Sequence, residues 1–422
     1  MNALSLPVPG PPRPNINICK VLSRLLPDLR RLAVYLGAFI GPLSGNSVLA
    51  LVPTLKGEFS STAPEILMSV SFFMIPFALF TLFSGTISDV YDRKKTVLLG
   101  FVVYAAGSLM CAASVSLDMF LLSRTVQGFG YGFVNPVLVA ILGDIVPFKE
   151  RGRAMGYLGA ATTTGIALGP FVAGYVAIAN WRLVFVLIAA LILLFALVFI
   201  AVFKGVVFER RAGSISKVVR TLAMGARNRS VMLLSLAGFL TFMCYVATLS
   251  FMSDFLSLEP FYLVESEIGT VMATTGFAGI LAAPVGGRLV DRIGRYRTAT
   301  IGFAIMIAAF VLLLSSASVE GHTASLAVLG AGAAFVWSAL LTLTVEVFPE
   351  QKGTASSLFN GARFFGYALA PLAFASAYTT MGMSSVYVSS VILAGAGVLA
   401  VWLVSLSQKA RGAESPIERG SR

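Results

Sequence analysis

Residues 181–203 read WRLVFVLIAALILLFALVFIAVF, and after Arg182 no charged residue occurs until Lys204. A membrane-spanning α-helix needs about 20 apolar residues in succession, so this stretch is long enough to cross a bilayer. The backbone of a chain in lipid must form its own hydrogen bonds, and a continuous apolar run without alternation does this as a helix. The stretch therefore predicts a transmembrane helix.

Eleven further apolar stretches of similar length lie on both sides of this one. Hydrophobic residues make up 57% of the chain and charged residues only 12%, whereas soluble domains contain about 25% charged residues. We therefore expect an all-α membrane protein with twelve transmembrane helices. The expected spans are residues 33–55, 66–88, 96–116, 119–143, 154–178, 181–203, 232–253, 266–287, 298–317, 324–346, 355–378 and 385–407.

The basic residues are distributed by loop. All but four of the 31 Lys and Arg residues lie in the leader, the central interval, the tail and every second loop between spans. The exceptions are Lys56 and Arg182 in the other loops, and Arg124 and Arg363 within spans. Because basic loops stay on the cytoplasmic side, we expect a multi-pass plasma-membrane protein with both termini in the cytoplasm. This distribution also argues against a nucleic-acid partner, because the net charge of +12 is not gathered on one surface.

The sequence contains an internal repeat. Residues 85–94 read GTISDVYDRK and residues 287–296 read GRLVDRIGRY, at an offset of 202 residues. At the same offset Asp144 and Pro147 recur as Glu346 and Pro349. Six spans separate the copies, so both copies have the same orientation, as in parallel repeats related by an axis along the membrane normal. We expect two pseudo-symmetric six-helix bundles. The predicted parts are a cytoplasmic tail (1–32), an N-terminal bundle (33–203), a cytoplasmic central loop (204–231), a C-terminal bundle (232–407) and a second cytoplasmic tail (408–422).

At these motifs the chain resembles the major facilitator superfamily, and within it the twelve-helix drug:proton antiporter group, over about residues 33–407. Residues 85–94 are similar to the superfamily's G-x-L-x-D-R-x-G-R-K signature but depart from it at Val90 and Asp92, whereas the second copy fits better. Residues 124–128, RTVQG, are similar to its R-x-x-Q-G motif, and the glycines of residues 156–174 to its antiporter motif. The resemblance implies the major facilitator fold and alternating access.

The repeated loop motif places acids and arginines at the ends of helices. Arg93 and Arg295 follow Asp89 and Asp291 by four residues, and each could pair with an acid of a neighbouring helix, namely Asp144 or Glu346. Pairs that form in one state and break in another would make a cytoplasmic latch; alternatively, they fix loop geometry only. Glycines at helix ends would allow close backbone approach. The expected latch residues are Gly85, Asp89, Arg93, Asp144, Gly287, Asp291, Arg295 and Glu346.

Small residues recur along residues 154–178. Glycine permits close helix contact, and a proline inside a helix removes one backbone hydrogen bond and favours a bend. We expect a pliable seam between the halves, with ordinary tight packing as the alternative. The seam residues are Gly165, Gly169, Pro170 and Gly174.

Two arginines lie inside spans, Arg124 and Arg363. A charged side chain in hydrocarbon costs roughly 2.5–3.5 kcal/mol, so such residues are functional candidates. Each belongs to a stripe of polar residues spaced three or four apart, which places the stripe on one helix face. The alternatives are that Arg124 reaches the outer interface and that Arg363 binds backbone carbonyls. The expected pathway residues are Asn46, Arg124, Gln127, Tyr131, Asn135, Thr163, Tyr245, Trp337, Asn360, Arg363 and Tyr367.

These observations favour a secondary transporter rather than an enzyme. The sequence has no G-x-x-x-x-G-K-[ST] phosphate loop, and we expect no cofactor, metal or catalytic site. Proton-coupled efflux of lipophilic small molecules, by a monomer, is the leading hypothesis. No Asp or Glu lies in the middle of a span, so a proton would have to bind Asp89, Asp144 or Asp254, or act through Arg124. The alternatives are a carrier of an anionic metabolite that uses Arg124 and Arg363, and a membrane receptor or scaffold that transports nothing.

Overall fold

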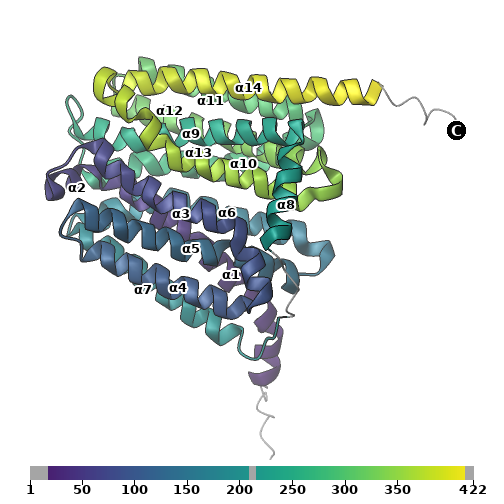
Figure 1. Cartoon of the computed structure of the whole chain (residues 1–422). Helices are drawn as coiled ribbons and strands as arrows, with labels where there is room; N and C mark the ends of the chain where they lie inside the picture. The colour runs from purple at the N-terminus through teal and green to yellow at the C-terminus, as the bar shows by residue number, and fades with distance from the viewer. Residues whose placement is uncertain (1–17, 209–214, 414–422) are drawn as a thin grey trace, which may run out of the picture.

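A computed structural model describes residues 18–208 and 215–413, which form fourteen α-helices and two short 3₁₀ turns. Twelve long helices run side by side across the view of Figure 1. The elements are α1 (Ile18–Ala50), α2 (Val52–Phe59), α3 (Ala63–Val90), α4 (Arg93–Ala112), α5 (Leu117–Ile145), η1 (Phe148–Glu150), α6 (Arg151–Ala177), α7 (Trp181–Val202), α8 (Ile215–Ala226), α9 (Arg229–Ser257), α10 (Glu265–Ile293), α11 (Arg295–Ser315), α12 (Val319–Glu346), η2 (Pro349–Gln351), α13 (Lys352–Met381) and α14 (Met383–Ala413).

Eleven of the described helices are long and apolar enough to cross a membrane, counting residues 26–50 of α1. The twelfth expected span, residues 355–378, corresponds to α13, which is 30 residues long but is not among the eleven. Its sequence is less apolar because it contains Lys352, Asn360 and Arg363. The helix that falls short in apolarity is therefore one that carries predicted pathway residues.

The first predicted span, 33–55, is interrupted in the structure. The α1 helix ends at Ala50, and α2 begins at Val52 with Pro53 in its first turn. A proline has no backbone N–H to continue the hydrogen bonds of the preceding helix, but it is well suited to the first turn of a new one. Leu51 lies between the two helices, and α2 forms a short separate element at one end of the bundle (Figure 1).

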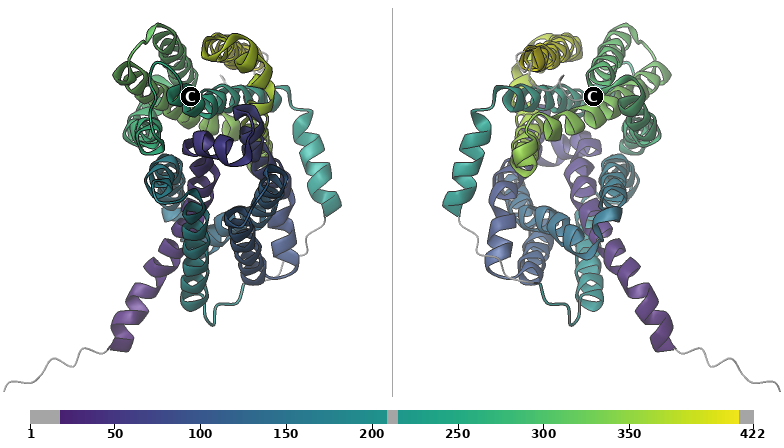
Figure 2. Two further views of the ribbon diagram at one scale, coloured as in Figure 1. Left: turned by 90° about the vertical axis from the view of Figure 1, so that its left-hand side faces the viewer. Right: turned by 90° about the vertical axis from the view of Figure 1, so that its right-hand side faces the viewer.

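The helices form two groups in space. In Figure 1 the helices α1–α7 lie in the lower half of the view and α9–α14 in the upper half, and Figure 2 shows the same two groups from both ends. We call them the N-terminal half and the C-terminal half. The central loop predicted at 204–231 contains the helix α8, and a Cβ on its Gly225 would lie 2.6 Å from Leu358 of α13. Residues 1–17, 209–214 and 414–422 of the predicted tails and loop lie outside the described residues.

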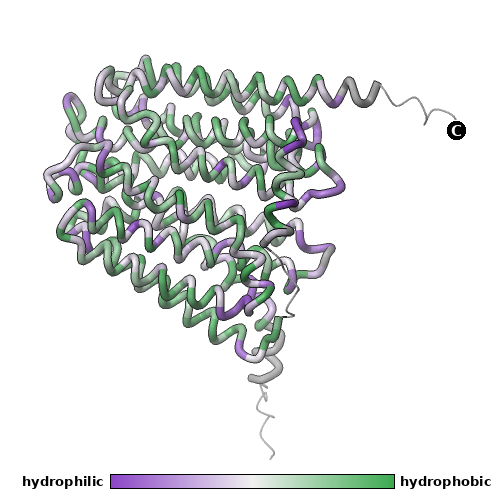
Figure 3. Tube along the Cα trace, in the orientation of Figure 1, coloured by the Kyte–Doolittle hydropathy of each residue, from purple (hydrophilic) through white to green (hydrophobic). Residues whose placement is uncertain are grey.

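The two ends of the bundle differ in charge. One end, which we call the Arg93 end, holds the α3–α4, α5–α6, α10–α11 and α12–α13 connections. At this end Lys94 donates hydrogen bonds to the backbone carbonyls of Phe203 (2.9 Å) and Val206 (3.3 Å). The opposite end, which we call the Lys56 end, holds α2 and the α4–α5, α6–α7 and α9–α10 connections. Figure 3 shows that hydrophilic residues gather toward the ends of the helices, while the middle of the bundle is mostly apolar.

Candidate functional site

The α6 and α10 helices face each other across the two halves, and they pack closely toward the Lys56 end. A Cβ on Gly174 would lie 2.2 Å from the carbonyl oxygen of Glu265, and a Cβ on Gly269 would lie 2.4 Å from the carbonyl oxygen of Pro170. A Cβ on Gly276 would lie 2.4 Å from the Cβ of Ala167. Only glycine fits at such positions, so the seam between the halves is closed along this part of both helices.

The same two helices have open space beside them toward the Arg93 end. No atom lies within 4 Å of the Cβ position of Gly152, Gly156 or Gly159 of α6, or of Gly287 of α10. Ala283 of α10, seven residues after Gly276 and so on the same helix face, is exposed, whereas Gly269 and Gly276, which face Pro170 and Ala167, are buried. The α6–α10 seam is therefore in contact at one end and open at the other.

Polar side chains tie the two halves together at the Lys56 end. Lys56 Nζ of α2 lies 2.5 Å from Asp254 Oδ1 of α9, and the Tyr378 hydroxyl of α13 donates to Asp254 Oδ2 over 2.7 Å. Thr54 of α2 donates a hydrogen bond to Glu265 at the start of α10. Asp254 is 4% exposed. A buried carboxylate with two charged or polar partners is a strong tie, because separating the partners would leave its charge uncompensated.

The α2 helix is fixed to its own half by a second ion pair. Arg182 at the start of α7 donates to Glu58 Oε1 over 2.8 Å and to the carbonyl of Ser114 over 2.9 Å. The hydrogen bond from Arg182 lowers the pKa of the Glu58 carboxyl below its usual range. The Phe59 ring packs edge-on against Trp181, with ring centroids 5.8 Å apart. These contacts hold Lys56 in position toward Asp254.

Arg124 is fully buried inside the N-terminal half. Its guanidinium donates to the Gln127 side-chain oxygen (2.7 Å) and to the carbonyls of Ser69 (3.3 Å), Ser44 (3.4 Å) and Gly45 (3.4 Å). The group also lies 4.5 Å from the centroid of the Phe73 ring. Its donors are thus used by α1, α3 and α5. This bonding fits a structural tie between three helices better than a group that receives a ligand.

Arg363 is surrounded by aromatic rings rather than by hydrogen-bond acceptors. Its guanidinium carbon lies 3.9 Å from the Trp337 ring centroid, 4.2 Å from that of Phe364 and 4.8 Å from that of Phe242. Its Nε is buried without a hydrogen-bond partner, and no ion pair reaches Arg363 from the described residues. The side chain is only partly buried. It is therefore a cation near the middle of the bundle with unused donors.

The rings around Arg363 continue across the seam into the N-terminal half. Phe364 of α13 contacts Phe77 of α3 edge to face, with centroids 4.7 Å apart, and Phe77 stacks on Tyr131 of α5 at 4.9 Å. Tyr131 is the central residue of α5, and Phe77 is close to the middle of α3. We call Arg363 and its five rings the Arg363 cluster: Phe77, Tyr131, Phe242, Trp337, Phe364 and Arg363.

The other predicted pathway residues lie at various depths around this cluster. The Tyr367 hydroxyl donates to Asn46 Oδ1 over 2.8 Å, which joins α13 to α1 across the halves. Gln127 is fully buried and donates to Ser108 Oγ over 2.7 Å, so it serves the Arg124 tie. The remaining predicted pathway residues, all half-buried, are Asn135, Thr163, Tyr245 and Asn360.

The predicted latch residues form three ion pairs, of which Arg93–Asp144 and Arg295–Glu346 are equivalent in the two halves. Arg93 of α4 pairs with Asp144 of α5 and also with Asp89 of α3, whose Oδ1 lies 2.7 Å from its Nη2. Arg295 of α11 pairs with Glu346 of α12, at the same separation of 51 residues along the chain. The repeat in the sequence is thus a repeat in contacts. Each pair joins helices of one half, so none bridges the seam, and a latch role stays a prediction.

The glycines of the two predicted groups differ in their surroundings. A Cβ on Gly165 would lie 2.4 Å from the carbonyl oxygen of Phe39, and one on Gly169 would lie 2.6 Å from that of Leu43, so these glycines pack α6 against α1 of the same half. Only Pro170 and Gly174 of the predicted seam contact α10. Gly85 and Gly287, for which the motif predicts close approach of a neighbouring backbone, have open space beside them in this structure.

Comparison with known sequences decides the family. The sequence profile of the Major Facilitator Superfamily matches residues 34–263 and 234–422, which together cover most of the chain. The chain belongs to the major facilitator superfamily. Members of this superfamily are membrane transporters of small molecules and not enzymes, so the predicted all-helical transporter fold is confirmed. The drug:proton antiporter subgroup remains a prediction.

Individual superfamily relatives are distant. The uncharacterized MFS-type transporter YceJ of Bacillus subtilis (strain 168) is 26% identical over 318 residues, 75% of this chain and 80% of that protein. The vacuolar membrane amino acid uptake transporter fnx2 of Schizosaccharomyces pombe (strain 972 / ATCC 24843) is 30% identical over 183 residues, 43% of this chain and 30% of that protein. Multidrug resistance protein 2 of Bacillus subtilis is 27% identical over 166 residues, 39% of this chain and 42% of that protein.

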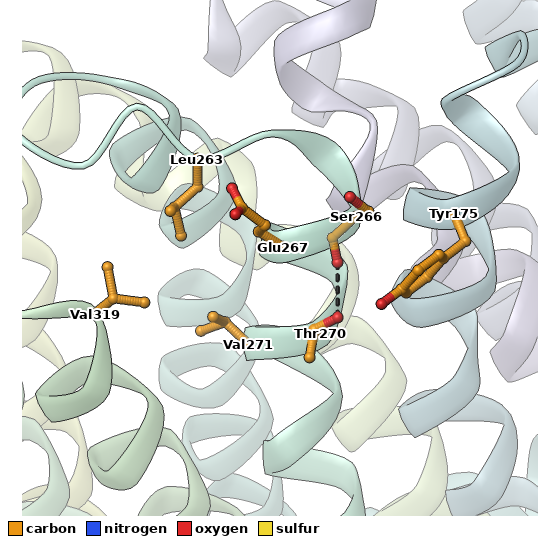
Figure 4. Close-up of a pocket in the computed structure, with 7 residues that line it drawn as sticks. All are labelled: Tyr175, Leu263, Ser266, Glu267, Thr270, Val271 and Val319. Carbon is orange, nitrogen blue, oxygen red and sulfur yellow. Dashed lines mark hydrogen bonds between the residues drawn. The ribbon is translucent and has the colours of Figure 1, made fainter.

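A pocket of about 350 Å³ opens near the Lys56 end of this superfamily member, beside the closed part of the α6–α10 seam. Figure 4 shows Tyr175 of α6 facing α10, where Thr270 donates to the carbonyl of Ser266 over 2.7 Å. No residue of the pocket was predicted from the sequence. It lies apart from the Arg363 cluster and marks the rim of the closed seam. The lining residues are Tyr175, Leu263, Ser266, Glu267, Thr270, Val271 and Val319.

Sequence reasoning missed several residues of the site. Phe77, Phe242 and Phe364 looked like ordinary members of apolar runs, and only their positions in space bring them to Arg363. The sequence marks Lys56 only as a basic residue on the less basic side, whereas in the structure it pairs with Asp254. One available signal was that Lys56 and Asp254 are each close to the end of an apolar run, at the same predicted side of the membrane.

Proposed function

We propose that this superfamily member exports lipophilic small molecules from the cell by alternating access, in exchange for protons. The observation that carries the proposal is the Arg363 cluster, where aromatic side chains of both halves meet near the middle of the bundle. Phe242, Trp337 and Phe364 of the C-terminal half are half-buried, and Phe77 and Tyr131 of the N-terminal half are buried. Transporters of this fold bind their substrates near the bilayer midplane at the interface of the repeats. An aromatic surface at that level suits a substrate that partitions into lipid.

The one-sided seam supports alternating access. The α6–α10 seam is closed at the Lys56 end and open at the Arg93 end. If the basic Arg93 end is cytoplasmic, as the Lys and Arg distribution predicts, this state is the one that loads substrate from the cytoplasm. Export then requires the Lys56 end to open and the Arg93 end to close.

Proton coupling has a restricted set of sites in this chain. No Asp or Glu of the described residues lies more than three residues inside its span. Asp89 and Asp144 are bound to Arg93, and Asp254 is bound to Lys56. A proton that binds one of these carboxylates would weaken the corresponding ion pair. We therefore place the coupling in the pairs at the ends of the helices rather than in a carboxylate at the midplane.

The surroundings of Arg124 argue against the alternative in which both Arg124 and Arg363 bind an anionic metabolite. All of the acceptors that Arg124 contacts belong to the protein itself, so only Arg363 has unused donors for an anion. The relatives include both a multidrug resistance protein and an amino acid uptake transporter, and each is matched over less than half of this chain.

The test is flux into proteoliposomes that contain the full-length purified protein. Uptake of radiolabelled chloramphenicol, rhodamine 123 and fluorescein would be measured with the interior acidic, with the interior alkaline and without a gradient, against protein-free liposomes. The proposal requires flux of at least one lipophilic probe that depends on the pH gradient. Flux independent of the gradient would remove the proton coupling, and binding without flux of any probe would favour the receptor alternative.

A further inference from the structure

The Arg363 cluster combines a cation, an aromatic enclosure and unused hydrogen-bond donors. A guanidinium has five N–H donors in a rigid fork and no acceptor. In this cluster the described residues supply three ring faces within 4.8 Å of its carbon but no carboxylate. Ring faces stabilise the charge of the guanidinium. They do not replace the directional acceptors that a buried N–H group requires.

Arg124 shows that this chain can satisfy a buried arginine when the arginine is structural. Arg124 lies at a similar distance from a phenylalanine ring, yet it also donates to three backbone carbonyls and to Gln127. Arg363 has the ring contacts without any of these acceptors, and its Nε is buried and unpartnered. The two arginines therefore differ in kind, and the acceptor for Arg363 must come from outside the described residues.

The electrostatic surroundings select the sign of that acceptor. The described Asp and Glu residues all lie close to the ends of spans or outside them, whereas Arg363 is eleven residues inside α13. A cationic ligand would meet a like charge with no carboxylate to offset it, and like charges repel strongly where water is scarce. A carboxylate or phenolate would instead accept paired N–H bonds from the guanidinium fork.

We infer that the Arg363 cluster binds lipophilic organic anions, meaning deprotonated weak acids that carry an aromatic ring, in preference to cations. The anionic oxygens bind the guanidinium, and the ring of the ligand packs against Trp337, Phe364 and Phe242. The inference rests on the proposed function because it names the substrate class of the same site. It is narrower, since export of lipophilic cations or neutral compounds would satisfy the proposed function and contradict the inference.

The test uses three probes with one apolar body: 4-tert-butylbenzoate, 4-tert-butylbenzamide and 4-tert-butylbenzylammonium. The chain has three tryptophans, so W181F/W402F leaves Trp337 of the cluster as the fluorescent reporter. Binding would be titrated by Trp337 fluorescence in the full-length protein in nanodiscs. We expect the benzoate to bind at least tenfold more tightly than the benzamide, and the ammonium to bind more weakly than both.

Variants then assign the preference to one side chain. R363M should reduce the benzoate-to-benzamide affinity ratio to about one while retaining benzamide binding, which also shows that the cluster is folded. R363K should keep part of the ratio, because lysine retains the charge but not the fork. The matched control is R297M, on an exposed arginine of α11, which should leave the ratio unchanged.

Four results would overturn the inference: preference for the ammonium, equal affinity for benzoate and benzamide, a ratio that survives in R363M, or no binding of any probe. Flux is measured separately in proteoliposomes. Benzoate binding at Arg363 without flux would remove the proposed transport function and leave the inference standing, whereas flux of cations alone would do the reverse.

Discussion

At the scale of single residues, Arg124 and Arg363 show how differently one residue type is used within one membrane protein. Arg124 connects three helices through carbonyls of α1 and α3 and a side chain of α5. Arg363 is held by rings, and its buried Nε has no hydrogen-bond partner among the described residues. We therefore assign stability to the first and recognition to the second, and each assignment predicts a different failure on mutation.

R124K should impair folding rather than substrate affinity. Lysine keeps the charge but cannot reach several carbonyls at once, so we expect a loss of about 1–3 kcal/mol, since hydrogen bonds from charged groups contribute on that order. Thermal unfolding in detergent, followed by size-exclusion chromatography, measures the loss. The KM of transport by the folded R124K protein should equal that of the wild type. An unchanged Tm together with a raised KM would indicate that Arg124 binds substrate.

Gly128 of the RTVQG motif should tolerate no side chain. A Cβ there would lie 2.0 Å from the carbonyl oxygen of Phe73 on α3. We expect G128A to destabilise the protein by about 1–3 kcal/mol, because the backbone must shift to admit the methyl group. The control is G395A on α14, where no atom lies within 4 Å of the Cβ position and alanine should be neutral or slightly stabilising. Equal Tm values for both variants would contradict this reading of the motif.

The sequence could indicate which residues were unusual but not which contacts they make. The cost of a charge in hydrocarbon marks Arg124 and Arg363 equally. Their difference depends on which neighbours come within reach, and Ser44, Ser69 and Phe242 belong to spans remote in the chain. The pairing of Arg93 with Asp144 and of Arg295 with Glu346 was predictable, because the repeat conserves both partners at the same offset.

At the scale of the elements, the α6–α10 seam should control which end of the protein opens. Its closed part depends on glycines that leave no room for a side chain, and its open part has glycines with free space beside them. In alternating access the open part must close when the closed part opens. Side chains added at the two parts should therefore have opposite effects on the same equilibrium.

G276V and G156V test this directly. Valine at Gly276 would collide with Ala167 in the present state, so it should shift the population toward opening at the Lys56 end. Valine at Gly156 has free space now but should hinder closure of the Arg93 end, which favours the present state. Distances between spin labels at Val115 and Tyr262, both exposed at the Lys56 end, measure the shift in a cysteine-free background. Two shifts in the same direction would rule out this role of the seam.

The helices themselves were largely predictable, because a span in lipid requires a long apolar run. Eleven expected spans match described candidate spans to within six residues at each end, apart from the start of the first, which lies seven residues earlier in the structure, and the twelfth matches α13. The errors have local causes: Pro53 starts the separate helix α2, and α8 forms within the interval predicted as a loop. The apolar residues of α8 are too few to signal a span, so hydropathy alone could not reveal it.

At the scale of the whole molecule, the two halves are connected unequally at their two ends. Among the described ion pairs, Lys56–Asp254 is the one that joins the halves, whereas the Arg93 and Arg295 pairs each stay within one half. The hydrogen bond from Thr54 to Glu265 lies beside it. Sequence patterns predicted the duplicated pairs because duplication repeats them. The tie between the halves exists once, so it leaves no repeat to detect.

Breaking this tie should favour opening of the Lys56 end. D254N removes the charge that holds Lys56 and weakens the bond to Tyr378, so we expect the open population to rise by a free energy on the order of 1–3 kcal/mol; the partly exposed Lys56 limits the effect. K56Q should raise the open population in the same way. The double variant K56Q/D254N should raise it little more than either single variant, because both substitutions remove the same interaction.

The Val115–Tyr262 spin-label distance reports the populations. The control is E58Q, which breaks an ion pair inside one half. Additive effects of K56Q and D254N, or an equal shift in E58Q, would show that the ends of the halves are held together by something other than this pair.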